Sequence, residues 1–322
     1  MSQLVAPGAR RAAPSLRRPR AQALRSGWLA LTLVAFLGLV LGACAPASDS
    51  TPDSQGASQG AESAAEAARE PRPPLDLSGV QVVDLTYAFD QNTLYWPTSP
   101  SAFELEQLHY GPVHGGADDG GYFYSANSFC TPEHGGTHLD APIHFGEGHQ
   151  TAEEIPLDRL MGPAVVVDVA EKAAADPDYR LSAEDVAAWE ATHGPVPAGA
   201  LVLLRTGWGE RWPDRLRYFG DDTPGDASNL HFPSYGEDAA RILVEERGVA
   251  ALGVDTASID HGPSTDFIVH QIAAAADVAG LENVAHLDQL PATGAWVLAL
   301  PMKIAGGSGG PVRIVALVPN AG

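Results

Sequence analysis

The chain is short of cysteine and of positive charge. Its 322 residues include two cysteines, Cys44 and Cys130, and 19 Lys and Arg stand against 40 Asp and Glu. Six arginines precede Cys44, so the remaining 13 basic and 40 acidic residues give the chain from Cys44 onward a net charge of −27. Such a balance argues against nucleic-acid binding and against electrostatic attraction to anionic lipid, both of which require basic surfaces. We therefore expect the protein to act on or bind a small molecule.

The one candidate membrane segment is too short to span a bilayer. It runs for sixteen uncharged residues, from Trp28 to Ala43, whereas a spanning helix takes roughly 20 apolar residues. The arginine-rich stretch before it completes the pattern of a secretion signal. The last residues, Leu41-Gly42-Ala43-Cys44, resemble the bacterial lipoprotein box, in which the cysteine receives lipid. The alternative is an anchor helix that is never cleaved.

Three regions follow from composition. Residues 1–44 are the predicted lipoprotein signal peptide. Residues 45–74 hold almost no large apolar side chain, so we expect a disordered tether that cannot offset its ordering entropy. Residues 75–322 are long enough for one domain with a substantial core. Lipid and tether together predict an extracytoplasmic lipoprotein anchored to a membrane, at the cell surface or in the periplasm.

Cys130 would be the single free thiol of the mature chain, and the core must hold without an intramolecular disulfide. Because Cys130 lies four residues before His134, it could ligate a metal. Burial as a small apolar side chain is the favoured interpretation.

The folded region alternates apolar runs with helical patterns and shows no internal repeat. Continuous apolar runs at 163–170, 200–208 and 249–256 predict strands buried on both faces. Further strands are expected near residue 80 and at 295–304 and 311–319. Helices are expected at 181–194, where Ser182 and Asp185 form a capping-box pattern, at 236–248, and at 266–280, ended by Gly280. A long loop with little regular structure is expected at 209–236, and a flexible loop at 306–310. The alternation indicates an α/β domain with a mixed sheet and flanking helices.

A histidine cluster stands out in "HGGTHLDAPIHF". It contains His134, His138, Asp140 and His144, and imidazole and carboxylate are ligands for Zn²⁺ and similar divalent ions. The glycines and Pro142 disfavour a continuous helix and favour a tight loop or the first turn of a short helix. His144 is either a further ligand or a nearby proton-transfer group.

The same stretch resembles the signature of the cyclase family of metal-dependent hydrolases, which includes bacterial kynurenine formamidases and isatin hydrolases. The segments "YWPTSP", "LVLLRTGW", "GVDTASID", "VHQIAAAADVAGLENVAHLDQLP" and "ALPMKIAGGSGGPVRIVALVP" also resemble that family. The resemblance covers about residues 80–320 and implies the swivelling β/β/α fold of a single cyclase-like domain. It also implies a homo-oligomer.

The resemblance implies a role for each matching residue. His134, His138 and Asp140 match ligands of a first metal ion, Zn or Mn. His270 and Glu282 match the pair that completes a second site, with Asp140 bridging, so one or two ions are expected. His144 matches a histidine that assists catalysis. Gly135 departs from the Thr or Ser that the family often has there. The 209–236 insertion and the leader argue against an intracellular role in tryptophan degradation.

Two functions remain open at this stage. The first is a hydrolase that uses metal-activated water on an amide, a formamide, a lactam or a related cyclic carbonyl compound. The alternative is a surface-tethered binding protein that keeps the metal but turns nothing over, and detection of turnover would discriminate between the two. Tyr95, Trp96 and Phe123 are candidate pocket residues, with aromatic core as the other interpretation. Asp255 and Asp260 follow a strand, a usual place for supporting site residues, although structural capping would also place them there.

Overall fold

The computed structural model describes residues 77–114 and 120–320. The chain divides into two units between Pro73 and Pro74, and all the described residues belong to the second. The predicted signal, the tether and the lipidation residue Cys44 lie outside the described residues. Within the described ranges, no helix has the length and apolar character needed to cross a membrane.

The second unit is built from short helices around a large sheet. The strands are β1 (Val80–Asp84), β2 (Glu104–Val113), β3 (Tyr122–Cys130), β4 (His138–Asp140), β5 (Met161–Asp168), β6 (Arg180–Leu181), β7 (Leu201–Arg205), β8 (Ser234–Tyr235), β9 (Ala251–Val254), β10 (Ala279–Glu282), β11 (Trp296–Pro301) and β12 (Gly309–Pro319). The α-helices are α2 (Ala170–Ala175), α3 (Ala183–His193), α4 (Arg215–Phe219), α5 (Glu237–Arg241) and α6 (Ile268–Ala275). Single 3₁₀ turns occur at Pro142–His144, Leu157–Arg159, Trp208–Arg211 and Leu287–Gln289, and a π-helical segment at Ile242–Glu246.

The main sheet closes on itself. Its order is β1-β12-β11-β5-β7-β9-β10-β4, and β4 also pairs with β12, so the strands from β12 to β4 close into a mixed barrel while β1 pairs with β12 alone. The run β5-β7-β9-β10 is parallel, and the other pairings are antiparallel. The predicted α/β fold with a mixed sheet and flanking helices is confirmed.

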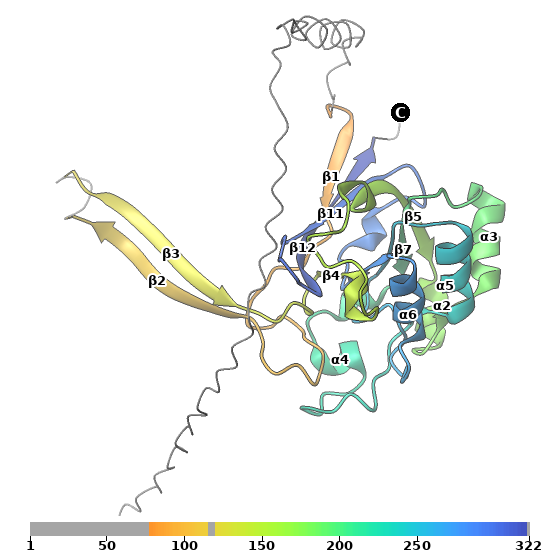
Figure 1. Cartoon of the computed structure of the whole chain (residues 1–322), viewed down its shortest axis with the longest axis horizontal. Coiled ribbons are helices and arrows are strands. Elements are labelled where there is room, and N and C mark those ends of the chain that lie inside the picture. Colours follow the sequence, from red (N-terminus) through yellow and green to blue (C-terminus); the bar gives the residue numbers. More distant parts are fainter. Residues whose placement is uncertain (1–76, 115–119, 321–322) are drawn as a thin grey trace, which may run out of the picture. The chain divides into compact units, whose positions relative to one another are not determined.

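Two cores explain the continuous apolar runs. Along β5, Ala164 and Val166 join a cluster with Leu201, Leu203 and residues of β11 and β12, inside the barrel. Val165 and Val167 join a second cluster with Val202, Leu204 and apolar residues of α3, α5 and α6. Successive strand residues point to opposite faces, so a strand that serves both cores carries no polar alternation. Figure 1 shows α2, α3, α5 and α6 along the side of the sheet that this second core covers.

The predicted helices form, with changes at their ends. Helix α3 has the predicted capping box, in which the Ser182 hydroxyl and the Asp185 carboxylate bond each other's backbone N–H. The helix predicted at 236–248 is α-helical only as far as Arg241 and continues as a π-helical turn. The helix predicted at 266–280 ends at Ala275, and Gly280 lies inside β10. Gly280 therefore does not terminate the helix. The backbone turns earlier, where Asp277 adopts a positive φ of 52°, and the residues that follow are drawn into the sheet by pairing with β9.

The prediction of long irregular loops was partly wrong. The 209–236 insertion contains α4 and β8, and its aromatic side chains are held in a third cluster with Leu94, Trp208, Tyr218, Phe219, Leu230 and Phe232. Burial of these rings gives the segment regular structure despite its polar composition. Gly309 and Gly310, expected in a flexible loop, are the first residues of β12 and pair with β4.

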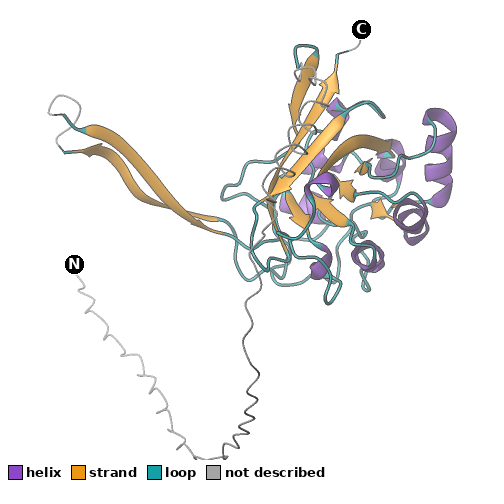
Figure 2. Cartoon of the chain, turned by 45° about the horizontal axis from the view of Figure 1, so that its top comes forward, coloured by secondary structure: helices purple, strands orange, loops and turns teal. Residues whose placement is uncertain are grey.

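The hairpin β2–β3 has no counterpart among the sequence predictions. Its two strands pair with each other and with no other strand in the described part of the chain. Figure 2 shows them as a two-stranded ribbon. Nearly all of its residues are exposed or partly exposed, so no buried face imposed a sequence pattern by which it could be found.

Candidate metal centre

The central residues of the histidine motif form a very short strand, β4, where the barrel closes. His138 and Asp140 lie on β4, two residues apart, and so share one face of the strand. This corrects the expectation of a loop or helical turn at these residues, and only Pro142–His144 forms a short 3₁₀ turn. Pairing with β10 and β12 imposes the extended backbone. Gly136 enters the strand with a φ of 57°, a conformation that favours glycine.

Strand pairing accounts for the position of Glu282. In the antiparallel β4–β10 pair, His138 is directly opposite Glu282 and Asp140 is opposite Gly280. Directly opposed side chains are neighbours on one face of a sheet. On its other side, Asp140 is opposite Gly309, where a Cβ atom would meet the His134 ring. The missing side chain leaves the space that His134 occupies.

His270 reaches the same place from α6. It lies in the first turn of that helix, and the Asp260 carboxylate accepts hydrogen bonds from the backbone N–H of Val269 and of His270, both at 3.1 Å. The same carboxylate lies 2.7 Å from His270 Nδ1. Asp260 therefore fixes both the helix start and the imidazole orientation.

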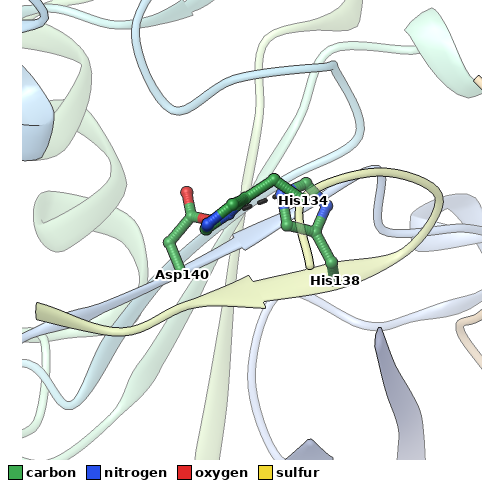
Figure 3. Close-up of side chains that lie close together, drawn as sticks. All are labelled: His134, His138 and Asp140. Carbon is green, nitrogen blue, oxygen red and sulfur yellow. Dashed lines mark hydrogen bonds and ion pairs between the residues drawn. The ribbon is translucent and has the colours of Figure 1, made fainter. Parts of the chain in front are cut away.

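The five candidate ligands lie together, with Asp140 common to both groups. Figure 3 shows His134 and His138 directed at the Asp140 carboxylate. His134 Nδ1 lies 2.6 Å and His138 Nε2 lies 3.2 Å from Asp140 Oδ1. His270 Nε2 lies 3.2 Å from Asp140 Oδ2 and 3.2 Å from Glu282 Oε1. His138 Nε2 is also 3.4 Å from Glu282 Oε2.

Hydrogen bonds on the outer side of each imidazole assign its tautomer. The Ser308 hydroxyl donates to Glu133 Oε2 at 2.6 Å, so its oxygen accepts from His134 Nε2–H at 2.9 Å. His138 Nδ1–H donates to the Gly136 carbonyl at 3.0 Å, and His270 Nδ1–H donates to Asp260. The other ring nitrogen of each histidine then carries a lone pair, and each lone pair faces the carboxylates.

This arrangement fits a bound cation. Three nitrogen lone pairs and two carboxylates face one another at about 3 Å with no N–H or O–H among the facing atoms of the neutral tautomers. Acceptors this close are stable only with protons or metal ions between them, and buried charges are ordinarily paired or coordinate metals. Two sets satisfy the ligand distances of a metal site, with ligand atoms within 4.8 Å of one another in each: His134, His138 and Asp140, and Asp140, His270 and Glu282. Asp140 belongs to both, as a bridging ligand would.

The electrostatics of the cluster also favour positive charge. Burial lowers the pKa of His138, but the Asp140 and Glu282 carboxylates outweigh burial and raise it to about 9. Burial likewise lowers the pKa of His270, and Asp140, Asp260 and Glu282 together raise it well above its usual value. Burial and the nearby Asp140 charge raise the pKa of Glu282. The same carboxylates that draw protons here would draw a divalent ion.

His144 lies beside this cluster without joining either ligand set. Its ring stacks on the His134 ring, with centroids 3.8 Å apart and planes 18° from parallel. Partial burial, reinforced by the neighbouring imidazoles and opposed by Asp140, lowers the pKa of His144 to about 4. The side chain still has an exposed face. A neutral imidazole that is open to solvent can accept a proton at neutral pH.

The other candidates separate into two groups. Tyr95 and Trp96 line a groove of about 550 Å³, together with Thr93, Pro97, Thr98, Ser99, Ser101, Ala102, Arg215, Asp222, Pro224 and Gly225. The Tyr95 ring packs on Gly135, where a Cβ atom would overlap it, and Gly135 follows His134 in the sequence. Phe123 lies on β3 with 61 % of its surface exposed and belongs to the hairpin, away from the ligand sets.

Asp255 and Cys130 play no part in the ligand sets. The Asp255 carboxylate accepts hydrogen bonds from the Thr206 N–H and hydroxyl and from the Gly207 N–H, and so joins the ends of β7 and β9. Cys130 is exposed, so the interpretation as a buried thiol was wrong. It ends β3 in the hairpin, where there is no core to receive it.

Sequence reasoning missed Ser308 and Glu133, which hold the outer nitrogen of His134. Glu133 immediately precedes His134, a signal that the motif offered. Ser308 stands among glycines far along the chain, and only the β4–β12 pairing brings it near.

Comparison with known proteins agrees with this geometry. Residues 83–261 match the family described as "Putative cyclase". The isatin hydrolase of Roseibium aggregatum is 34 % identical over 255 residues, which cover 76 % of this chain and 95 % of that protein. This chain belongs to the cyclase family. It is a metal-dependent hydrolase of the class that acts on carbon–nitrogen bonds other than peptide bonds.

Two further proteins are similar to this chain. The kynurenine formamidase of Salinibacter ruber is 31 % identical over 186 residues, which cover 56 % of this chain and 74 % of that protein. A crystal structure of an isatin hydrolase bound to the product analogue thioisatinate aligns with a TM-score of 0.68 and 30 % identity, covering 84 % of this chain and all of that one.

Proposed function

We propose that this hydrolase opens a small cyclic amide of the isatin type, with Zn²⁺ or Mn²⁺ held by His134, His138, Asp140, His270 and Glu282. The observation that carries the proposal is the convergence of three imidazole lone pairs and two buried carboxylates beside a neutral histidine. The substrate class is supported by the isatin hydrolase relative, which this chain matches over 95 % of its length.

A divalent ion held there would polarise the substrate carbonyl and lower the pKa of a water molecule from about 16 toward about 7. Imidazole nitrogens with carboxylate oxygens suit both Zn²⁺ and Mn²⁺. The hydrogen bonds that the imidazoles donate to Ser308, Gly136 and Asp260 orient the three rings before any ligand arrives, as such supporting contacts do at metal sites.

In the proposed reaction, His144 transfers a proton from the attacking water to the leaving nitrogen. It accepts a proton from the attacking water as the water oxygen bonds to the carbonyl carbon. It then donates that proton to the ring nitrogen as the carbon–nitrogen bond breaks. The product is a single open-chain molecule that carries an amine and a carboxylic acid. The carboxylic acid is ionised at pH 7. Its position against His134 keeps His144 within reach of the reacting atoms.

The groove beside Tyr95 and Trp96 is the candidate site for the aromatic part of the substrate. Its volume of about 550 Å³ lies inside the usual range for small-molecule sites, about 300–1,000 Å³.

A substrate panel tests the proposal. The full chain is stripped of metal, reloaded with Zn²⁺ or Mn²⁺, and assayed on isatin, a cyclic imide, a lactone and N-formylaniline. We expect ring opening of isatin with a kcat/KM at least tenfold above that for N-formylaniline. Faster hydrolysis of N-formylaniline would reassign the chain as a formamidase. Thermal stabilisation by isatin without turnover would favour the binding-protein alternative.

We further propose that the chain is a lipoprotein outside the cytoplasm, anchored through Cys44. The support is the sequence alone: the arginine-rich start, the short apolar run and the residues before Cys44. We expect Cys44→Ala to remove fatty-acid labelling and membrane anchoring, measured by fractionation of cells expressing the chain. A fully labelled, membrane-bound Cys44→Ala variant would contradict the proposal.

A further inference from the structure

Asn283 directly follows the candidate ligand Glu282 and is itself buried, with 3 % of its surface exposed. It comes just after β10 and has a left-handed backbone with a φ of 55°, a conformation that asparagine enters more readily than most residues. The strand register places Glu282 opposite His138, so Asn283 would be opposite Thr137 if the ladder continued. Because the backbone turns at Asn283, side-chain hydrogen bonds join the two segments instead.

These hydrogen bonds connect Asn283 to the two residues that lead into β4. The amide nitrogen of Asn283 donates to the Gly136 carbonyl at 2.7 Å, and the Thr137 hydroxyl donates to the Asn283 carbonyl at 2.7 Å. A carbonyl oxygen can only accept, so the amide must present its nitrogen to Gly136. The contact therefore ties the start of one ligand-bearing strand to the end of the other.

The Gly136 carbonyl is also the group that orients His138. Its oxygen accepts a second hydrogen bond, from His138 Nδ1–H at 3.0 Å, with the other of its two lone pairs. His138 Nε2 is thereby left with the lone pair that faces Asp140 and Glu282. Gly136 has no side chain to hold its peptide in place, and the Asn283 amide holds the oxygen on which the imidazole depends.

The Asn283 amide is held in turn by the 209–236 insertion. Tyr218 of α4 is fully buried, and its hydroxyl lies 2.9 Å from Asn283 Oδ1 and 3.0 Å from the Asp255 carbonyl oxygen. The single hydroxyl hydrogen is shared between these two acceptors. The Trp208 indole N–H donates to the Tyr218 carbonyl at 2.7 Å, and both rings belong to the third apolar cluster. Packing of the insertion therefore sets where the Tyr218 hydroxyl lies.

We propose that Asn283 is a positioning residue of the metal centre, and that Tyr218 couples the 209–236 insertion to it. The contacts run from the Tyr218 hydroxyl to the Asn283 amide, and from that amide through the Gly136 carbonyl to the His138 imidazole. Loss of supporting contacts of this kind lowers metal affinity by roughly 10- to 100-fold. The proposal rests on the metal centre proposed above and is independent of the choice of substrate.

The alternative is that Asn283 serves only the fold, as a residue suited to a left-handed turn. The substitution Asn283→Gly separates the two roles, because glycine adopts the same backbone and lacks the amide. With a purely structural role, the metal-free variant would lose free energy of unfolding but would bind metal like the wild type once folded.

Metal affinity tests the proposal on the full chain, in competition between the metal-free protein and a chromogenic chelator for Zn²⁺. We expect roughly 10- to 100-fold weaker binding for Asn283→Gly. Tyr218→Phe, which loses one hydrogen bond, should bind about three- to tenfold more weakly. The matched control is Tyr235→Phe, an equally buried tyrosine whose hydroxyl bonds the Val202 and Gly253 carbonyls, and it should bind Zn²⁺ like the wild type. Wild-type affinity in Asn283→Gly, or an equal loss in Tyr235→Phe, would overturn the proposal.

Two further measurements separate positioning from stability. Because Tyr218 acts through Asn283, the double variant Tyr218→Phe/Asn283→Gly should bind Zn²⁺ no more weakly than Asn283→Gly alone, and additive losses would refute the coupling. The visible absorption spectrum of the Co²⁺-loaded chain reports the ligands around the ion. It should change in Asn283→Gly and stay unchanged in Tyr235→Phe, and a wild-type spectrum in Asn283→Gly would contradict the positioning role. A wild-type chain that binds neither ion would overturn the metal centre and this proposal with it, whereas wild-type binding with unaltered variants would overturn this proposal alone.

Discussion

The role assigned to Asp260 leads to a sharp prediction for Asp260→Asn. In the structure the Asp260 carboxylate accepts from His270 Nδ1–H and from two backbone N–H groups. The bonds divide between the two oxygens: Oδ1 accepts from the Val269 N–H, and Oδ2 accepts from the His270 N–H and faces Nδ1. An asparagine has one oxygen, so its NH₂ group must face either the Val269 N–H or the two His270 nitrogens. In both orientations the negative charge that holds the proton on Nδ1 is lost, and with it the support for the Nε2 lone pair that faces Asp140 and Glu282.

The expected magnitude is a 10- to 100-fold loss of metal affinity, the usual effect of removing a supporting carboxylate, or about 1.4–2.7 kcal/mol. The assay is competition between the metal-free full chain and a chromogenic chelator, with Zn²⁺ and Mn²⁺ in turn. His270→Ala sets the affinity expected when the ligand is absent. Asp255→Asn is the matched control, because it alters an equally buried carboxylate that touches none of the five ligands. Wild-type affinity in Asp260→Asn, or an equal loss in Asp255→Asn, would refute this role of Asp260.

Three further predictions follow from the same structure. His138→Ala should lose bound metal, measured by elemental analysis after dialysis, and unchanged stoichiometry would contradict its role as a ligand. His144→Ala should keep its metal but turn over the confirmed substrate roughly 10²-fold or more slowly, so full activity would remove His144 from the proton path. Asp185→Ala should lower the free energy of unfolding by about 1 kcal/mol through loss of the α3 cap, measured by urea unfolding. Burial raises the pKa of Asp185, but bonds from Lys172, Tyr179 and Ser182 outweigh burial and lower it to about 2. A depressed carboxyl pKa stabilises the fold above its unfolded value of about 4, and that contribution is lost as pH falls toward 2. The wild-type advantage should therefore shrink over that window, and an advantage that persists at pH 2 would contradict the assignment.

Local patterns predicted much of the fold. The apolar runs of β5, β7 and β9 could be recognised because a strand buried on both faces has no polar alternation. The start of α3 was visible because its cap is built from residues three apart. Strand β4 was not predictable, since its three residues are extended only through pairing with strands from distant parts of the chain.

The same distinction between local pattern and long-range contact applies to the residues of the metal site. The His134–His144 motif indicated a metal because its ligands are close in sequence, and family resemblance added His270 and Glu282. The contacts that orient those ligands, such as Ser308 on His134 and Asp260 on His270, depend on long-range geometry. The exposed hairpin escaped prediction for a different reason, because a surface without a buried face leaves no periodic signal within one chain.

The barrel is closed by β4, the same three-residue strand that carries His138 and Asp140. Its closure brings two carboxylates and three imidazoles together in a buried space, and the raised pKa values of His138 and His270 reflect the protons that those carboxylates hold on the rings. A divalent ion would take the place of those protons, so metal binding should release protons and weaken as the pH falls. Barrel closure and proton-coupled metal uptake thus depend on the same three-residue strand.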